Sequence, residues 1–435
     1  MDFALFILVN CALFLRPQDL VSGLETVPLY NVLIVVNLLV AAPAIVHQLK
    51  RGIGRSPATV CVIGILVALV LSLVVRADLD KAWEWGLEFL KVVAYFLLIT
   101  AVLTNAQRFG WYLTTVVVLT LALSALATAS FHGQLYLPAI THPRQTNLDA
   151  ATGDLTSSYR LAAFGVFADP NDLSMIVVLS MLICLGAIFY RKLGTARFAI
   201  VVPLLFLGYV LALTESRGGL IALIVGMAAF FFNRFGVSRA GAAFAGVVVL
   251  LLMVYGGRQA DIAGGISGGT GSQRTDLWYS GLQMMKWHPI LGIGHGRFVQ
   301  EEGLVAHSSY VQALAEWGLV GGTLFIGLIY IVLVSVWRLK SVRKQIDSPM
   351  LRNFQPYLMG ALAAYAASML TLTRCDVVPT YLVAGLGVSF ERLACRGTTV
   401  QPLKLTPRLL AQMAGVSLGF ILLLYIYIRF VYRLF

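Results

Sequence analysis

The sequence predicts an all-α polytopic membrane protein with about 12 or 13 transmembrane helices and two long outer segments. Of its 435 residues, 59% are hydrophobic and 12% are charged, whereas soluble domains carry roughly 25% charged residues. Apolar runs long enough to cross a bilayer core of about 30 Å recur along nearly the whole chain. These observations exclude an ordinary soluble domain. The cysteines stand singly, without CxxC spacing, which argues against a disulfide framework or a zinc site.

Thirteen apolar stretches of the chain are interpreted as spans of one transmembrane domain over residues 1–435. They cover residues 2–15, 27–46, 57–75, 82–103, 111–131, 172–190, 197–213, 218–232, 240–255, 318–336, 356–372, 377–391 and 409–428. The first, eighth and twelfth are short for a full crossing, so we expect them to be tilted, broken or re-entrant.

The charge distribution orients these spans. If the N-terminus lies in the cytoplasm and each span crosses once, the cytoplasmic loops hold eighteen basic residues and one acid, Asp347. The basic residues are Lys50, Arg51, Arg55, Arg108, Arg191, Lys192, Arg197, Arg234, Arg239, Arg338, Lys340, Arg343, Lys344, Arg352, Arg392, Arg396, Lys404 and Arg408. Cytoplasmic loops of membrane proteins carry such an excess, so most of the net charge of +12 needs no nucleic acid as a partner.

Two long segments, residues 132–171 and 256–317, fall on the outer face, which predicts that the protein works there. The Gly- and Ser-rich stretch 256–274 is compatible with a mobile lid and equally with an unstructured connection. The following TDLWYSGLQMMKWHP predicts an amphipathic helix that lies along the outer face of the membrane and is ended by Pro289.

Four arginines on the outer face run against the charge bias: Arg160, Arg217, Arg274 and Arg374. Each one alone is explained by snorkelling or by pairing with a neighbouring acid. Several of them converging on one pocket would bind a diphosphate, because the guanidinium fork matches phosphate oxygens.

Histidine is the other candidate for chemistry. His307 stands where the second outer segment enters a span, and its ordinary pKa suits proton transfer near neutral pH, although a helix cap is the simpler reading. His295, in the tight turn GIGHG, is a second possible reactive group, and Arg297 lies in the same polar stretch.

Metal and nucleotide chemistry are not predicted. The six histidines include no i, i+4 pair on a helix. In ADPND, Asp169 and Asp172 resemble a magnesium pair, but Pro170 and Asn171 predict a turn and Asp172 a helix cap, which leaves Asp169 to hold an arginine or a substrate hydroxyl. Because no phosphate-binding glycine loop occurs, the energy for a reaction must arrive in the substrate.

The combination of these motifs resembles the O-antigen ligase and O-antigen polymerase superfamily of bacterial inner membranes. The signature of that superfamily is His, then Asn, Ser or Gln, nine residues, Gly, two residues, and Gly, Thr or Tyr. His307, Ser308, Gly318 and Gly321 match it in full. The run TDLWYSGLQMMKWHPILGIGHGRF, SRGGL with Arg217, and FADPND after Arg160 are also similar to family motifs.

The resemblance implies a metal-independent, all-helical glycosyltransferase of GT-C-like architecture, without a cofactor, in the bacterial inner membrane and with its active site facing the periplasm. The donor would be a glycan on a polyprenyl (undecaprenyl) diphosphate, and the acceptor a growing glycan or lipid A core. His307 would be the general base, Arg217 and Arg274 would bind the diphosphate, and Arg160 would be a weaker third ligand. Arg374, Asp169, Asn171, His295 and Arg297 complete the candidate substrate-binding set.

Polymerase and ligase remain alternatives, with a polymerase of surface polysaccharide preferred and a chain-length regulator protein as a possible partner. A secondary transporter is the alternative from another class. It would need ionisable residues within the membrane, and Glu84, Glu88 and Lys91, on one face of a span, are the candidates for that role.

Overall fold

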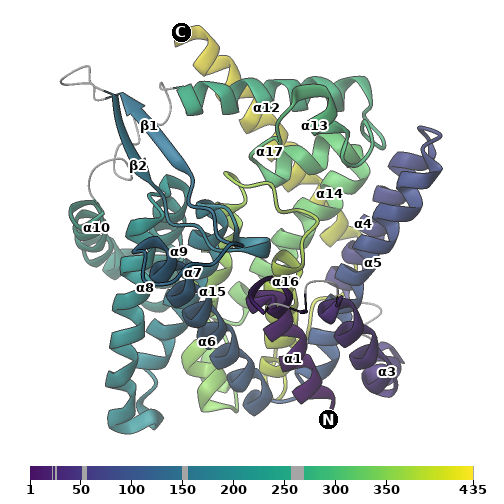
Figure 1. Ribbon diagram of the computed structural model, residues 1–435. Coiled ribbons are helices and arrows are strands. Elements are labelled where there is room, and N and C mark those ends of the chain that lie inside the picture. Colours follow the sequence, from purple (N-terminus) through teal and green to yellow (C-terminus); the bar gives the residue numbers. More distant parts are fainter. Residues whose placement is uncertain (22, 25–26, 51–55, 149–154, 256–268, 435) are drawn as a thin grey trace. The chain divides into compact units, whose positions relative to one another are not determined.

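The computed structural model describes residues 1–435 apart from 22, 25–26, 51–55, 149–154, 256–268 and 435 (Figure 1). Each expected span overlaps a helix, which confirms the all-α polytopic membrane class. Nine of the described helices are long and apolar enough to cross a membrane, fewer than the 12 or 13 expected. Of the others, α1 has 14 residues and α16 has 17, shorter than the roughly 20 residues that a crossing takes.

The chain forms two compact units. The first comprises Met1–Asn37, Gln107–Asp261 and Asn353–Ser368, and the second Leu38–Ala106, Ile262–Arg352 and Met369–Phe435. Helices α3 (Leu29–Lys50) and α15 (Pro349–Ser368) run from one unit into the other.

The first unit is built around α7 (Pro170–Ile188), which packs against α8 (Val201–Leu213) and α9 (Arg217–Phe235). The apolar window of α7 is 78% buried, against 17% for the segment that contains α8, so α7 is central and α8 peripheral. The remaining elements of this unit are α1 (Asp2–Leu15), α2 (Pro17–Leu20), α6 (Ala106–Phe131), β1 (Arg144–Leu148), β2 (Leu155–Tyr159), η2 (Gly165–Phe167), η3 (Arg191–Ile200) and α10 (Val237–Val254).

Strands β1 and β2 form an antiparallel hairpin in which Arg144 pairs with Tyr159 and Leu148 with Leu155 (Figure 1). This hairpin lies in the first long outer segment, where the sequence predicted no strand. The two strands are short and polar, RQTNL and LTSSY, and neither has the alternation of apolar and polar residues that predicts a strand.

The second unit is built around α14 (Ser309–Arg338), which contacts α4 (Pro57–Val74), α12 (Gly269–Trp287), α16 (Val378–Ala394) and α17 (Pro407–Leu434). It also contains α5 (Leu79–Val102), α13 (Arg297–Glu302) and η5 (Arg343–Gln345). Only 22% of the apolar window of α17 is buried. Its exposed Leu418, Leu422 and Phe430 suit contact with lipid.

Helix α12 lies where an amphipathic helix was expected, but it begins earlier, at Gly269. The end of the Gly- and Ser-rich stretch is therefore helical, and residues 256–268, where a lid was considered, lie outside the described residues. Leu277 and Trp278 pack with Phe298 and with Leu424 and Ile428 of α17, so at least part of the apolar side of α12 faces protein.

Helix α14 is interrupted at Gly318, whose φ of 63° and ψ of −163° are not helical. The turn after α12 fills the break. Ile293 and Gly294 donate to the carbonyls of Ala315 (2.9 Å) and Glu316 (3.1 Å), and the N–H groups of Leu319 and Val320 donate to Pro289 (2.7 Å) and Ile290 (3.2 Å). A broken helix in a membrane protein must have its freed backbone groups satisfied in this way.

The two crossing segments require glycine. A Cβ on Gly318 would meet backbone atoms of Ile290 and Gly292, and a Cβ on Gly292 would meet backbone atoms of Ala315 and Glu316. Both glycines have positive φ, which other residues adopt only under strain. The break separates a first half-helix, which begins two residues after His307, from the long apolar remainder of α14.

Candidate active site

The candidate residues divide between the two units, and each unit is described by itself. The first unit holds Arg160, Asp169, Asn171 and Arg217. The second unit holds Arg274, His295, Arg297, His307 and Arg374.

Arg160 is largely buried in the first unit, with 9% of its surface exposed. Its Nε donates to the carbonyl of Thr214 (2.8 Å), and its Nη2 donates to Oδ1 of Asn171 (3.2 Å). The same Asn171 oxygen accepts from the hydroxyl of Ser216 (2.7 Å). Arg160 and Asn171 therefore fix the Thr214–Ser216 turn, from which Arg217 leads into α9.

Asp169, not the predicted Asp172, caps α7. Its Oδ1 accepts from the N–H of Asn171 (2.7 Å), while Asp172 is fully buried in the first turn. Pro170 explains the difference, because proline favours the first helical position, and the cap is then the residue before it, Asp169. The exposed Asp169 is thus committed through one oxygen to the helix start.

Arg217 is the first residue of α9, half-buried, with Ser216 as the cap that accepts from the N–H of Gly219 (3.1 Å). A basic side chain is electrostatically unfavourable at a helix N-terminus, where anions are preferred. Its neighbour Glu215 accepts from the hydroxyl of Ser158 (3.0 Å). An anion beside Arg217 would gain from both the guanidinium and the helix end.

His307 is half-buried at the start of α14 and has a φ of 48°, a left-handed conformation that is uncommon outside glycine. The residues after it are anchored. Ser309 donates through its N–H to Met369 (2.9 Å) and through its hydroxyl to Leu372 (2.6 Å), and it accepts from the N–H of Arg374 (2.8 Å). These bonds hold the segment that carries His307 against the segment that carries Arg374.

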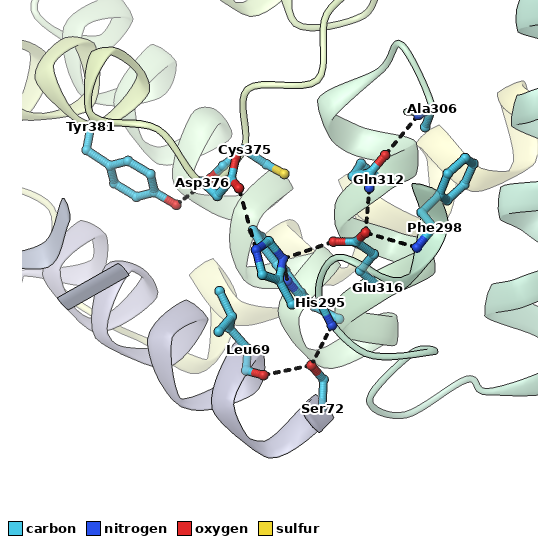
Figure 2. Close-up of polar contacts among 11 residues, drawn as sticks. Leu69, Ser72, His295, Phe298, Ala306, Gln312, Glu316, Cys375, Asp376 and Tyr381 are labelled. Carbon is cyan, nitrogen blue, oxygen red and sulfur yellow. Dashed lines mark hydrogen bonds and ion pairs between the residues drawn. The ribbon is translucent and has the colours of Figure 1, made fainter. Parts of the chain in front are cut away.

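His295 does not lie open in its turn. It is 4% exposed, packs edge-on against Trp85, and places Nδ1 2.9 Å from Oε2 of Glu316 and Nε2 3.5 Å from Oδ2 of Asp376 (Figure 2). Burial lowers the pKa of His295, but the hydrogen bond to Glu316 and the charges of Glu316 and Asp376 outweigh it, so the pKa lies above its ordinary value.

Two candidate arginines of the second unit, Arg274 and Arg297, differ in their surroundings. Arg297 begins α13 and pairs through Nη2 with Oδ2 of Asp78 (3.2 Å), which also receives Lys81 (3.3 Å). Arg274 is half-buried in α12. The Arg297–Asp78 contact gives Arg297 a structural partner within the unit.

Sequence reasoning did not connect Glu316, Gln312, Asp376 or Ser72 with His295, although it considered Asp376 as a partner of an outer-face arginine. Glu316 and Gln312 carried a readable signal, since two polar residues at i, i+4 inside an apolar helix are costly unless paired. Ser72 and Asp376 belong to segments far away along the chain, and nothing local marks them as partners of His295.

Among the described residues, no group of three or more His, Cys, Asp or Glu side chains is arranged to hold a metal ion. The second unit provides a half-buried imidazole, His307, just before an interrupted helix, and each unit provides arginines. An imidazole can take a proton from a hydroxyl, and a guanidinium can stabilise a phosphate leaving group.

The comparisons with known proteins bear on this chemistry. No curated protein matches the chain. Residues 202–326 match the family model described as O-antigen ligase, a region that includes Arg217, Arg274, His295, Arg297 and His307. The chain is thus a multi-pass membrane protein whose residues 202–326 match the O-antigen ligase family, which supports the resemblance to the O-antigen ligase and polymerase superfamily.

Proposed function

We propose that the protein transfers a glycan from a polyprenyl diphosphate, of the undecaprenyl type, to an acceptor hydroxyl at the periplasmic face of the bacterial inner membrane. His307 is the general base. The observation that carries the proposal is the placement of this residue at the start of the interrupted helix α14, within the O-antigen ligase family match.

In this reaction His307 takes the proton from the acceptor hydroxyl, and the oxygen attacks the anomeric carbon of the donor sugar. The bond between that carbon and the diphosphate oxygen breaks on the opposite side, so the anomeric configuration inverts. The electron pair stays on the lipid diphosphate, and the proton stays on His307 until solvent removes it. A positioned general base contributes about 10²–10⁴-fold to such a rate.

Arg217 and Arg274 are proposed to neutralise the charge that grows on the diphosphate, with Arg160 and Arg374 as further ligands. The basic residue at the N-terminus of α9 supports this role for Arg217, because the helix end favours the same anion. Loss of a group that stabilises charge in a transition state costs about 10²–10³-fold in kcat.

A polymerase of surface polysaccharide, with a growing glycan as acceptor, remains the preferred form of the proposal, and a ligase acting on lipid A core is the alternative. The transporter alternative has less support. Lys91 lies 2.6 Å from Glu88 of its own helix, and the side chain of Glu88 is 57% exposed, so these charges form a local ion pair.

The test uses the purified full chain in nanodiscs with a polyprenyl-diphosphate-linked oligosaccharide, in EDTA, and measures release of the lipid diphosphate. We expect transfer in the native chain, and its loss in His307→Ala and Arg217→Ala. His47→Ala, an exposed histidine, and Arg234→Ala, at the other end of α9, are the matched controls and should keep native activity.

The products separate the alternatives. A ladder of lengthened lipid-linked glycans identifies a polymerase, and glycan on added lipid A core identifies a ligase. Donor that stays intact with the native chain, or full activity in both His307→Ala and Arg217→Ala, would overturn the proposal. Activity that requires an added metal would overturn metal independence.

A further inference from the structure

A buried polar network runs from His295 to the residue before His307. Its side chains are nearly inaccessible: His295 is 4% exposed, Gln312 4%, Glu316 1% and Ser72 fully buried. Figure 2 shows them linked in sequence, with Glu316 and Gln312 on one helix, His295 in the turn that fills the break of α14, and Ser72 on α4. Such groups stay buried only when their hydrogen bonds are satisfied.

The two carboxylate oxygens of Glu316 have different partners. Its Oε1 accepts from Nε2 of Gln312 (2.6 Å) and from the N–H of Phe298 (3.3 Å). An oxygen with two donors carries no proton, so a proton shared by the two side chains lies between Oε2 and Nδ1 of His295, which are 2.9 Å apart. The raised pKa of His295 favours this proton on Nδ1, which donates to Oε2. The Trp317 indole nitrogen lies 3.2 Å from the same Nδ1, but Nδ1 cannot accept from it while donating to Glu316. Because the contact of Nδ1 with Glu316 is the shorter of the two, we assign Nδ1 as the donor to Glu316.

The same reasoning fixes the amide of Gln312. Because its Nε2 faces a carboxylate, which only accepts, its Oε1 must point the other way, and it accepts from the N–H of Ala306 (2.9 Å). The carbonyl of Ala306 accepts from the indole nitrogen of Trp278 (3.0 Å). Both backbone groups of Ala306 are therefore held, one residue before the strained His307.

We propose that His295, Glu316 and Gln312 are positioning residues, which hold the backbone at Ala306 and thereby orient the side chain of His307. This inference rests on the proposed function of His307 as the base. His295 itself acts through the others, because its ring nitrogens face Glu316 and Asp376 and its surface is closed. Asp376, with 29% of its side chain exposed, is the open end of the network.

Protonation of His295 is part of this device. Two charged groups face His295 itself, Glu316 from α14 and Asp376 from the segment before α16. Near its segment, Arg76 donates to the Gly292 carbonyl (2.8 Å), and Arg297 pairs with Asp78. With its raised pKa, His295 is charged at low pH and loses its proton as pH rises through that value. Glu316 then loses its counter-charge, so we expect kcat to fall on the alkaline side.

Two variants test the network in the nanodisc assay. Gln312→Leu removes the link to Ala306 at similar volume, and we expect kcat to fall about 10–100-fold, the effect of a small misplacement of a catalytic group, with the KM for donor unchanged. Glu316→Gln keeps an acceptor for Gln312 and pairs its amide with a neutral His295. We expect it to retain most of kcat and to lose the alkaline limb of the pH profile.

The controls separate positioning from folding. Ser335→Ala removes a buried hydroxyl elsewhere on α14, which donates within its own turn to Val332. This variant should match the native chain in kcat and pH profile. If Gln312→Leu fails to fold, Trp278→Phe removes the other bond to Ala306 while keeping an aromatic ring, and it should lower kcat without a change in KM.

Two results are distinguishable. If His307→Ala keeps native activity, the proposed base is wrong. If His307→Ala is inactive while Gln312→Leu or Trp278→Phe keeps native kcat, or Glu316→Gln keeps the alkaline limb, the positioning role is overturned and the proposed function stands.

Discussion

Arg160 combines a proposed role at the diphosphate with contacts that fix the first unit. It donates to the Thr214 carbonyl and to Asn171, while the N–H of Arg160 donates to Pro143 (3.0 Å). A buried guanidinium with such acceptors is costly to remove, because truncation leaves the acceptors unpaired. Arg160 therefore affects the stability of the unit independently of any substrate.

We predict that Arg160→Ala lowers the free energy of unfolding by about 1.5–3 kcal/mol, the worth of hydrogen bonds to a charged group. The measurement is unfolding of the purified protein in detergent. Arg144→Ala is the matched control. Arg144 begins β1 opposite Tyr159, the residue before Arg160, is exposed and reaches only Ser157 (2.9 Å) in its described contacts. Its effect should stay within about 0.5 kcal/mol. Equal stability of the two variants would contradict a stabilising role for the contacts of Arg160 with Thr214 and Asn171.

The sequence singles out candidate residues where a polar side chain stands in an apolar environment. Arg217 and His307 stand out because they are polar at the ends of apolar runs, and the family match covers both. The burial of His295 was not predictable. Its glycine-rich turn suggested an exposed loop, whereas the structure inserts that turn into the break of α14 and surrounds His295 with residues from α4, α5 and the segment before α16.

At the scale of elements, the sequence predicted the location of the helices well, because apolar length alone defines a span. It did not predict the break of α14. Gly318 lies in an apolar run in which glycine is ordinary, and the partners of the freed backbone come from Pro289–Gly294, outside the helix. The β1–β2 hairpin was missed for a similar reason, since pairing between two short polar strands is not encoded within either strand.

We predict that Gly318→Ala destabilises the protein by about 3 kcal/mol or more, because it adds a side chain at a glycine-only conformation and against the backbone of Ile290 and Gly292. Unfolding in detergent measures the loss. Gly415→Ala, a glycine of α17 with open space around its Cβ position, should be neutral or stabilising by up to about 1 kcal/mol. Similar stability of Gly318→Ala and the native chain would exclude the break.

At the scale of the whole molecule, the charge pattern makes a statement about orientation that the helices alone do not make. The expected cytoplasmic loops hold the basic residues, and the candidate residues fall in segments expected outside. The described cysteines are free, and all but the half-buried Cys11 are buried, so an introduced cysteine can report its own side of the membrane.

We predict that Glu301→Cys reacts with a membrane-impermeant maleimide in cells with a permeabilised outer membrane, whereas Lys404→Cys reacts only after the inner membrane is opened. Both positions are exposed. The native chain measures the background from its own cysteines. The reverse pattern would place the N-terminus outside and remove the periplasmic assignment of the site.

The crossing of Gly292 and Gly318 also determines how the gene can recover from damage. A Cβ at Gly318 meets main-chain atoms, which no substitution elsewhere removes. A Cβ at Gly327 meets the side chain of Met413, which a smaller residue there would relieve. Selection for suppressors should therefore restore glycine itself in strains that carry Gly318→Ala, but should also return changes at Met413 in strains that carry Gly327→Ala.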